Sequence, residues 1–189
     1  MGKETKEKIL NTAFRLFVNN SYEGVTIDEI AEEAGVSKGA VFHYFDSKFE
    51  LANSSIFYYM EDNWMPIYDD ILRTEDPDHM LKETIDYSFD FFHDNPKFMR
   101  FFMELYERSK NEDMIEEQID DFYKELLDMG KEMFERLDAD NPKLKAHLLT
   151  ACLDGLALQF TFFGGKEDFP DLDDLKDETY NIFSGDEKK

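Results

Sequence analysis

The chain has 189 residues and a formal net charge of −23, because 44 Asp and Glu stand against 21 Lys and Arg. Hydrophobic residues make up 42% and aromatic residues 15%, which excludes a disordered acidic tail. The single cysteine excludes an internal disulfide framework and a zinc site built from cysteines. The sequence has neither an apolar stretch of membrane-spanning length nor a signal-peptide core, so we expect a cytoplasmic protein that contacts no membrane.

The excess acid lies outside the first quarter of the chain. Residues 1–50 carry a net charge of −3, and the other 139 residues carry −20. Phosphate binding normally leaves a basic footprint, so the first quarter is the part most compatible with nucleic acid. We interpret the remaining acid as a solvated, self-repelling surface; adaptation to a salty cytoplasm and a cationic ligand are the alternatives.

The sequence favours helices along its whole length. No stretch alternates between apolar and polar residues between turn signals, and all four valines lie in the first quarter. We predict an all-α protein with about nine helices, at 4–20, 27–34, 38–44, 48–73, 77–93, 96–109, 112–137, 142–163 and 171–184. Asx-Pro pairs are expected to cap three of them, at Asp76-Pro77, Asn95-Pro96 and Asn141-Pro142. Pro66 is expected to kink or end the fourth helix.

Two short helices and a tight turn are predicted between residues 26 and 45. Thr26 and Glu29 have the spacing of a capping box, and Gly35 is suited to the positive φ that ends a helix. Ser37 then caps a second helix, so the segment predicts a helix-turn-helix. Ser47 with Glu50 forms a further capping box and places Lys48 where its ammonium and free backbone N–H groups can hold a phosphate.

Residues 5–51 resemble the DNA-binding domain of the TetR/AcrR family of transcriptional regulators. The match covers about a quarter of the chain, and its pattern is highly specific. It departs from the family at Ser21, where glycine is usual, so Asn20 or Ser21 must make a strained turn with a side chain present. The matching residues are Ile9-Leu10-x-x-Ala13-x-x-Leu16-Phe17, Tyr22, Val25-Thr26, Ile30-Ala31-x-x-Ala34-Gly35-Val36-Ser37 and Lys38-Gly39-x-x-Phe42-x-Tyr44-Phe45-x-x-Lys48-x-x-Leu51.

The resemblance implies a dimeric, ligand-responsive regulator, more often repressor than activator, that binds double-stranded DNA at a palindromic operator. It divides the chain into a three-helix DNA-binding domain at 1–47 and a helical ligand-binding and dimerisation domain at 48–189. Family positions that commonly meet the DNA backbone correspond to Thr26, Lys38, Gly39, Tyr44 and Lys48. Those that usually meet bases correspond to Ala40, Phe42 and His43, and Ser37 completes the candidate DNA-binding set.

The segment from Leu148 to Phe163 is apolar on nearly every face, which predicts cover by a second subunit. We expect the dimer interface to include Leu149, Cys152, Leu153, Leu156, Phe160, Leu175 and Ile182. The body also holds more aromatic residues and methionines than a thin helical layer can bury, which favours an apolar pocket for a small lipophilic effector. The candidate lining residues are Tyr59, Trp64, Phe89, Phe92, Phe102 and Tyr106.

Other function classes find less support. The sequence contains no glycine-rich phosphate loop, nucleophile elbow or HExxH motif, so we predict no enzyme and no cofactor. His79, His93 and His147 form no spaced set with carboxylates that indicates a metal site. A helical scaffold protein without DNA binding is the alternative, but such a protein has no need of the capped residues between Ser37 and Lys48.

Overall fold

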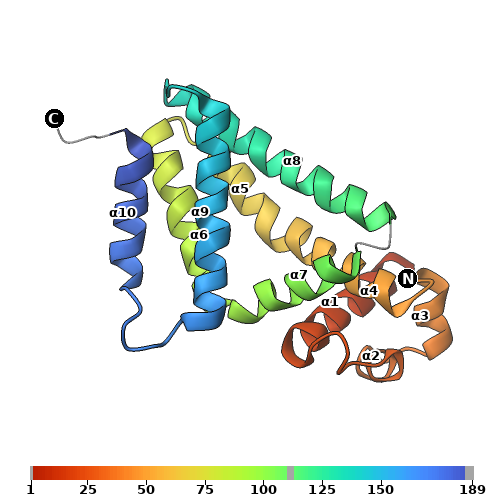
Figure 1. Ribbon diagram of the computed structural model, residues 1–189. Helices are drawn as coiled ribbons and strands as arrows, with labels where there is room; N and C mark the ends of the chain where they lie inside the picture. Colours follow the sequence, from red (N-terminus) through yellow and green to blue (C-terminus); the bar gives the residue numbers. More distant parts are fainter. Residues whose placement is uncertain (1, 110–112, 186–189) are drawn as a thin grey trace. The chain divides into compact units, whose positions relative to one another are not determined.

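The computed structural model describes residues 2–109 and 113–185, except for the side chains of 113–117, and these ranges contain helices and no strand. The predicted all-α class is therefore confirmed. The helices are α1 (Gly2–Asn20), α2 (Ile27–Glu33), α3 (Lys38–Tyr44), α4 (Lys48–Tyr59), the π-helical turn η1 (Met60–Trp64), α5 (Met65–Leu72), α6 (Pro77–Asp94), α7 (Pro96–Ser109), α8 (Asp113–Arg136), α9 (Pro142–Phe163) and α10 (Leu172–Ser184) (Figure 1).

The fourth predicted helix is interrupted directly before Pro66. There α4 passes into η1, in which the Met65 N–H donates to the Met60 carbonyl five residues earlier. Pro66 has no N–H to donate, and π-helical geometry occurs mostly as a single turn of this kind within an α-helix. The chain continues as α5 beyond this turn, so the proline changes the helix without ending it.

The Asx-Pro pairs behave differently from one another. Asp76 caps α6 as predicted, since its carboxylate accepts the Asp78 N–H at 3.0 Å. Asn95 instead donates from Nδ2 to the Phe91 carbonyl at 2.9 Å, because it also ends α6. Asn141 has φ 56° and its side chain makes no capping hydrogen bond. Asp76 and Asn141 thus both occupy the predicted N-cap position before a first-turn proline, although only the Asp76 side chain makes a capping hydrogen bond, and Asn95 ends the preceding helix.

The structure forms two compact units. Unit 1 comprises residues 1–66 and 100–115, and unit 2 comprises 67–99 and 116–189. Helix α1 packs on both α2 and α4, so the packing unit continues past residue 47. The predicted boundary between residues 47 and 48 separates functions, DNA binding from ligand binding and dimerisation, and not packing units, so it stays a prediction.

An aromatic core holds unit 1 together. Phe14 stacks on Tyr59 with ring centroids 4.0 Å apart, and Phe17 stacks on Phe101 at 5.5 Å. Ile9, Ala13 and Phe17 of α1 are fully buried. Full burial of a side chain as large as Ile9 or Phe17 contributes about 1.5–3 kcal/mol, which fixes α1 as the support for α2 and α4.

In unit 2, α6 packs against both α9 and α10 (Figure 1). Phe89 of α6 meets Phe160 of α9 edge to face, and Lys176 of α10 pairs with Asp90 at 2.6 Å. The Arg136 guanidinium donates to the backbone carbonyl of residue 72, the last of α5, and to those of residues 74 and 75 in the connection to α6.

Candidate functional site

The turn before α2 is made by Ser21, as one of the two predicted positions. Ser21 has φ 66°, in the left-handed region where a side chain is strained. The adjacent Tyr22 N–H donates to Glu104 Oε2 at 3.0 Å, and the Tyr22 ring stacks on Phe17 at 5.7 Å. The surrounding packing therefore holds the turn that glycine usually makes.

The start of α2 is fixed by the predicted capping box. The Glu29 N–H donates to Thr26 Oγ1 at 3.2 Å, and the Thr26 N–H donates to Glu29 Oε2 at 2.7 Å. The Thr26 N–H bond first, and then the bond that the Thr26 hydroxyl donates to the same carboxylate at 2.9 Å, lower the pKa of Glu29 below its usual value. Gly35 has the predicted positive φ, 63°, and the N–H of Val36 donates back to Ala31 at 2.9 Å. The helix-turn-helix geometry follows from these local bonds.

Helix α3 is anchored along one side and open along the other. Ser37 caps it by accepting the Ala40 N–H at 3.1 Å. Val41 and the following Phe45 are buried, so they hold the helix to the core of unit 1. Phe42 points the opposite way and is 46% exposed, an unusual position for a phenylalanine in a seven-residue helix.

All nine candidate DNA-binding residues are accessible. Thr26, Ser37, Lys38, Gly39, Phe42 and His43 are exposed, and Ala40, Tyr44 and Lys48 are half-buried. Gly39 lies at the start of α3, where an added Cβ would meet nothing closer than Ser37 Oγ at 3.8 Å. Space around Gly39 therefore exists within the protein, and any need for glycine there must come from a bound partner.

The polar groups of three candidate DNA-binding side chains, Lys38, Tyr44 and Lys48, have partners within unit 1. Lys38 Nζ pairs with Asp28 at 2.8 Å, and both side chains are more than half exposed. Lys48 Nζ lies 4.3 Å above the Tyr22 ring, and the Tyr44 hydroxyl donates to the Gly2 carbonyl at 3.1 Å. Exposed contacts of this kind contribute little stability, so a phosphate can replace them at small cost.

The cap of α4 differs in one bond from the predicted box. Ser47 Oγ accepts the Glu50 N–H at 3.0 Å as expected, but the Glu50 carboxylate accepts the N–H of Asp46 at 2.6 Å. The backbone N–H of Ser47 is thus not tied to Glu50 in the way the prediction required. Lys48 remains in the first turn of α4.

The sequence did not predict one residue of this region, Arg108. Arg108 of α7 lies 4.5 Å from the Tyr22 ring centroid and pairs with Glu23, 85 residues away in sequence. Tyr22 therefore has cations at two sides, Lys48 and Arg108, although it entered the prediction only as part of a motif. No local pattern connects α7 to residue 22, so the sequence carried no signal for Arg108.

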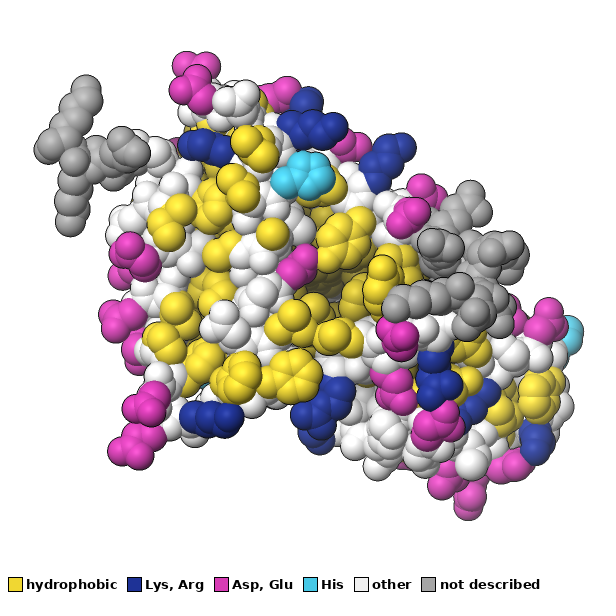
Figure 2. Space-filling model, in the orientation of Figure 1, with side chains coloured by type: hydrophobic (Ala, Val, Ile, Leu, Met, Phe, Trp, Pro, Cys, Tyr) yellow, Lys and Arg dark blue, Asp and Glu magenta, His cyan; other side chains and the backbone are white. Residues whose placement is uncertain are grey.

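The exposed apolar surface of α9 is not the predicted one. Leu149 and Phe160 are only 3% and 5% exposed, because α6 covers them within the same chain. The accessible residues are four, three, four and seven positions apart, which places them along one side of the helix, and they define what we call the α9 stripe: Leu144, Leu148, Ala151, Gly155 and Phe162. Figure 2 shows hydrophobic side chains gathered over α9 and beside α10.

The other predicted interface residues are accessible to different degrees. Cys152, Leu153, Leu156 and Leu175 are half-buried, and Ile182 of α10 is exposed. Burial raises the pKa of the Cys152 thiol, and its hydrogen bond with Thr179 opposes this rise. By length and composition alone, α9 is apolar enough to cross a membrane, a property that it shares with core helices of globular proteins.

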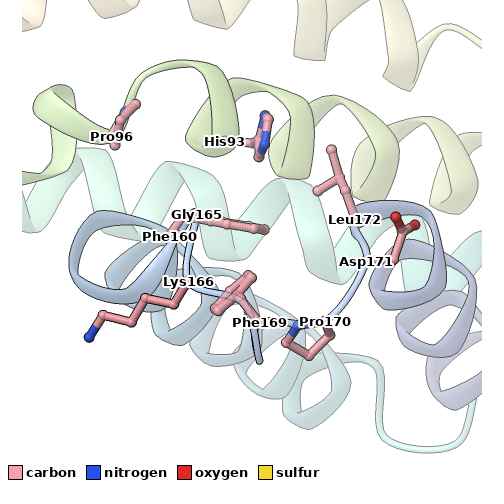
Figure 3. Close-up of a pocket in the computed structure, with 10 residues that line it drawn as sticks. His93, Pro96, Phe160, Gly165, Lys166, Phe169, Pro170, Asp171 and Leu172 are labelled. Carbon is pink, nitrogen blue, oxygen red and sulfur yellow. The ribbon is translucent and has the colours of Figure 1, made fainter.

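The six candidate pocket residues are divided between the units. Tyr59, Trp64, Phe102 and Tyr106 belong to unit 1, and Phe89 and Phe92 belong to unit 2. Their common role as a pocket stays a prediction. Unit 2 has a separate cavity of about 470 Å³ beside the α9–α10 connection, lined by His93, Phe160, Phe169 and Leu172 among others; Lys166 extends away from it (Figure 3).

The histidines belong to no cluster of metal-ligating side chains in the part of the chain that the structure describes. Within residues 2–109 and 113–185, no group of three or more His, Cys, Asp or Glu side chains is arranged to hold a metal ion. His93 contacts Asp94 at 3.1 Å and packs edge to face against Phe160. These are ordinary surface and packing contacts of a histidine at the end of α6.

Comparison with known proteins gives matches over both parts of the chain. Residues 9–54 match the family of bacterial regulatory proteins of the tetR type, and residues 77–172 match the C-terminal domain of BetI-type transcriptional repressors. The HTH-type transcriptional regulator YerO of Bacillus subtilis is 39% identical over 98 residues, which are 51% of this chain and 34% of YerO.

A second relative is a repressor. IcaR of Staphylococcus epidermidis, a negative transcriptional regulator of the biofilm operon icaADBC, is 25% identical over 101 residues, 53% of this chain and 52% of IcaR. The matched regions thus span about a third to a half of the length of these two curated relatives.

Solved structures extend the likeness of the fold to nearly the whole chain. A TetR transcription regulator from Haloarcula marismortui superimposes with a TM-score of 0.81 at 20% identity, covering 96% of this chain and 97% of its own. AibR, solved in complex with isovaleryl coenzyme A and operator DNA, has a TM-score of 0.65 at 17% identity and covers 95% and 98%. The two family matches together decide the assignment: the chain belongs to the TetR family of transcriptional regulators.

Proposed function

We propose that the protein is a homodimeric repressor that binds a palindromic operator through α3 and leaves it when a small molecule binds. The exposed face of α3 carries this proposal. That face combines a cation, a glycine and an aromatic pair on a helix whose opposite side is buried. A surface of this composition fits the floor of a major groove between two phosphate backbones.

The side chains of the interface divide into two roles. Thr26, Ser37, Lys38, Gly39, Tyr44 and Lys48 are assigned to phosphates, and Ala40, Phe42 and His43 to base edges and thymine methyl groups. Lys38 exchanges Asp28 for a phosphate, and Lys48 swings from the Tyr22 ring toward the backbone. Phe42 then loses its exposed apolar area to the DNA, which gives a reason for its position.

The acidic residues beyond position 50 affect the strength of DNA binding through long-range repulsion. A net charge of −20 outside the first 50 residues repels the phosphate backbone at long range. Non-specific binding is therefore weak, and the specific complex depends on close contacts made by α3 and the start of α4. Added salt screens this repulsion as well as the attractive contacts, so we expect a shallow dependence of operator affinity on salt.

The dimer is proposed to form through the α9 stripe together with Ile182 of α10. Leu148, Phe162 and Ile182 each expose more than half of their surface on neighbouring helices. A second copy covers them by two-fold symmetry, since each copy presents the same surface. The half-buried Leu153, Leu156, Cys152 and Leu175 flank this surface. Two α3 helices then lie about one DNA turn apart, roughly 34–36 Å.

Ligand release is proposed as a two-state shift. AibR was solved with both a coenzyme A ester and operator DNA, which supports a ligand-responsive regulator of this fold here. A ligand that binds the non-DNA state more tightly shifts the population away from the operator-binding separation of the α3 helices. The π-helical turn before Pro66 is the proposed lever, because an irregular turn is the easiest part of that helix to bend. The cytoplasm is the proposed location.

Selection of binding sites from a random DNA pool with the full chain tests the proposal. We expect enrichment of one inverted repeat whose half-sites are centred about one helical turn apart. A helical scaffold without DNA binding, the alternative, enriches nothing. Enrichment of a single unpaired half-site refutes the dimeric mode of binding while leaving DNA binding intact.

A further inference from the structure

Charged side chains from α4 and α7 meet at the ring of Tyr22 in unit 1. The guanidinium of Arg108 lies 4.5 Å from the ring centroid, and Lys48 Nζ lies 4.3 Å from it. The Tyr22 N–H donates to Glu104 Oε2 at 3.0 Å. Burial raises the pKa of the Tyr22 hydroxyl, and the charge of Arg108 opposes this rise. The ring is therefore uncharged at neutral pH, and the two cations are attracted to its π electrons.

Arg108 also occupies the carboxylates beside this ring. It forms an ion pair with Glu23, the residue that follows Tyr22, and its guanidinium lies 4.0 Å from Glu104 Oε1. The Glu23 side chain is 68% exposed, whereas that of Glu104 is 25% exposed and is already bonded to the backbone. Glu23 is thus the carboxylate that another cation can reach most easily if Arg108 is removed.

Lys48 rests on a ring and not on a carboxylate. Among the residues that the structure describes, it forms an ion pair with none. An exposed contact between an ammonium and a ring is weaker than a charge-assisted hydrogen bond to a carboxylate. Lys48 therefore leaves the Tyr22 ring for a phosphate more readily than it would leave an acid. A Glu23 carboxylate released beside the same ring would compete with the phosphate for Lys48.

We propose that Arg108 is a positioning residue for operator binding, which holds the Glu23 carboxylate and so keeps Lys48 available to the DNA backbone. This inference rests on the proposed contact between Lys48 and a phosphate. It adds a residue of α7, outside the helix-turn-helix, to those on which operator affinity depends. Arg108 acts through Lys48 and makes no contact with DNA in this role.

The affinity of the full chain for its selected inverted repeat, measured by anisotropy at fixed salt, tests the proposal. Arg108→Met keeps an apolar stem over Tyr22 and is expected to weaken binding about three- to tenfold, since each protomer of the dimer loses one exposed electrostatic contribution. Adding Glu23→Gln to Arg108→Met is expected to restore most of this loss. Arg100→Met, at an exposed position on the same helix, removes an equal charge and is expected to leave binding unchanged.

Lys48→Ala separates positioning from a merely structural role. In the Lys48→Ala background we expect Arg108→Met to have no further effect, because the group through which Arg108 acts is gone. A loss of the same size in that background overturns the proposal, as does wild-type affinity of Arg108→Met or an equal loss in Arg100→Met. Circular dichroism checks the fold of each variant. Arg108→Gln keeps hydrogen-bond donors without the charge, so it carries the same expectations if the methionine variant does not fold.

The same measurements distinguish this inference from the proposed function. If Lys48→Ala alone binds the operator as tightly as the wild type, the proposed phosphate contact of Lys48 is wrong. If Lys48→Ala weakens binding but Arg108→Met weakens it equally in both backgrounds, only the positioning role of Arg108 is wrong.

Discussion

Truncation of Leu148 is expected to weaken the dimer without damaging the protomer. Leu148 is 54% exposed on the α9 stripe. Burial of the exposed half of a leucine contributes about 0.8–1.6 kcal/mol, from about 1.5–3 for a whole side chain. Each dimer buries two copies. Since alanine keeps one methyl group, we expect Leu148→Ala to cost about 1–3 kcal/mol, a rise of roughly 5- to 150-fold in the dimer dissociation constant.

Sedimentation equilibrium over a concentration series measures this constant directly. Met103→Ala is the matched control, because Met103 is a similarly exposed apolar residue on α7, outside the α9 stripe. The melting temperature of the monomer at high dilution checks that Leu148→Ala still folds. A dissociation constant for Leu148→Ala equal to that of the wild type and the Met103→Ala control refutes the assignment of the α9 stripe.

Three further outcomes are expected. In anisotropy titrations on operator variants, Lys48→Ala lowers affinity for all sequences alike, whereas His43→Ala changes the preferred sequence. A changed sequence preference in Lys48→Ala would contradict the assignment of Lys48 to a phosphate. Asp154→Asn raises the melting temperature at pH 7 but not near pH 3. Burial raises the pKa of the Asp154 carboxyl, so the folded chain binds this proton more tightly than the unfolded chain does. The wild type therefore loses stability as the pH rises through that pKa, and the asparagine variant does not. Arg136→Met lowers the free energy of unfolding in urea by about 2–4 kcal/mol, because backbone carbonyls lose a charged donor.

Local signals in the sequence were enough to predict the DNA-reading end. The capping box of Thr26 and the positive φ of Gly35 each depend on residues within about four positions. Backbone hydrogen bonding and φ limits act over that range, so residue type alone decides them. The candidate DNA-binding residues are accessible for the same reason, since Val41 and Phe45 take the buried side of α3.

The sequence did not predict which faces of α9 are buried, because contacts between residues far apart in the chain decide this. Helix α9 is apolar on several faces, so its periodicity does not tell which face α6 covers, and Leu149 and Phe160 turned inward while Leu148 and Phe162 stayed outside. The hydrogen bond between Tyr123 and Asp154 joins residues 31 apart, with no pattern linking them. Periodicity reports how much of a helix is apolar, but the partner of each face depends on the tertiary fold.

The spacing of the two half-sites tests the central claim, a symmetric pair of α3 helices on one face of the DNA. The measurement is the anisotropy of the full chain on the selected inverted repeat and on a repeat with about five base pairs inserted at its centre, half a helical turn. The half-turn insertion moves one half-site to the opposite face of the DNA, so we expect the affinity to fall to that of a single half-site. Insertion of a full turn is expected to weaken the affinity as well, because the distance between the two α3 helices of the dimer is fixed. Unchanged affinity after the half-turn insertion would contradict the account.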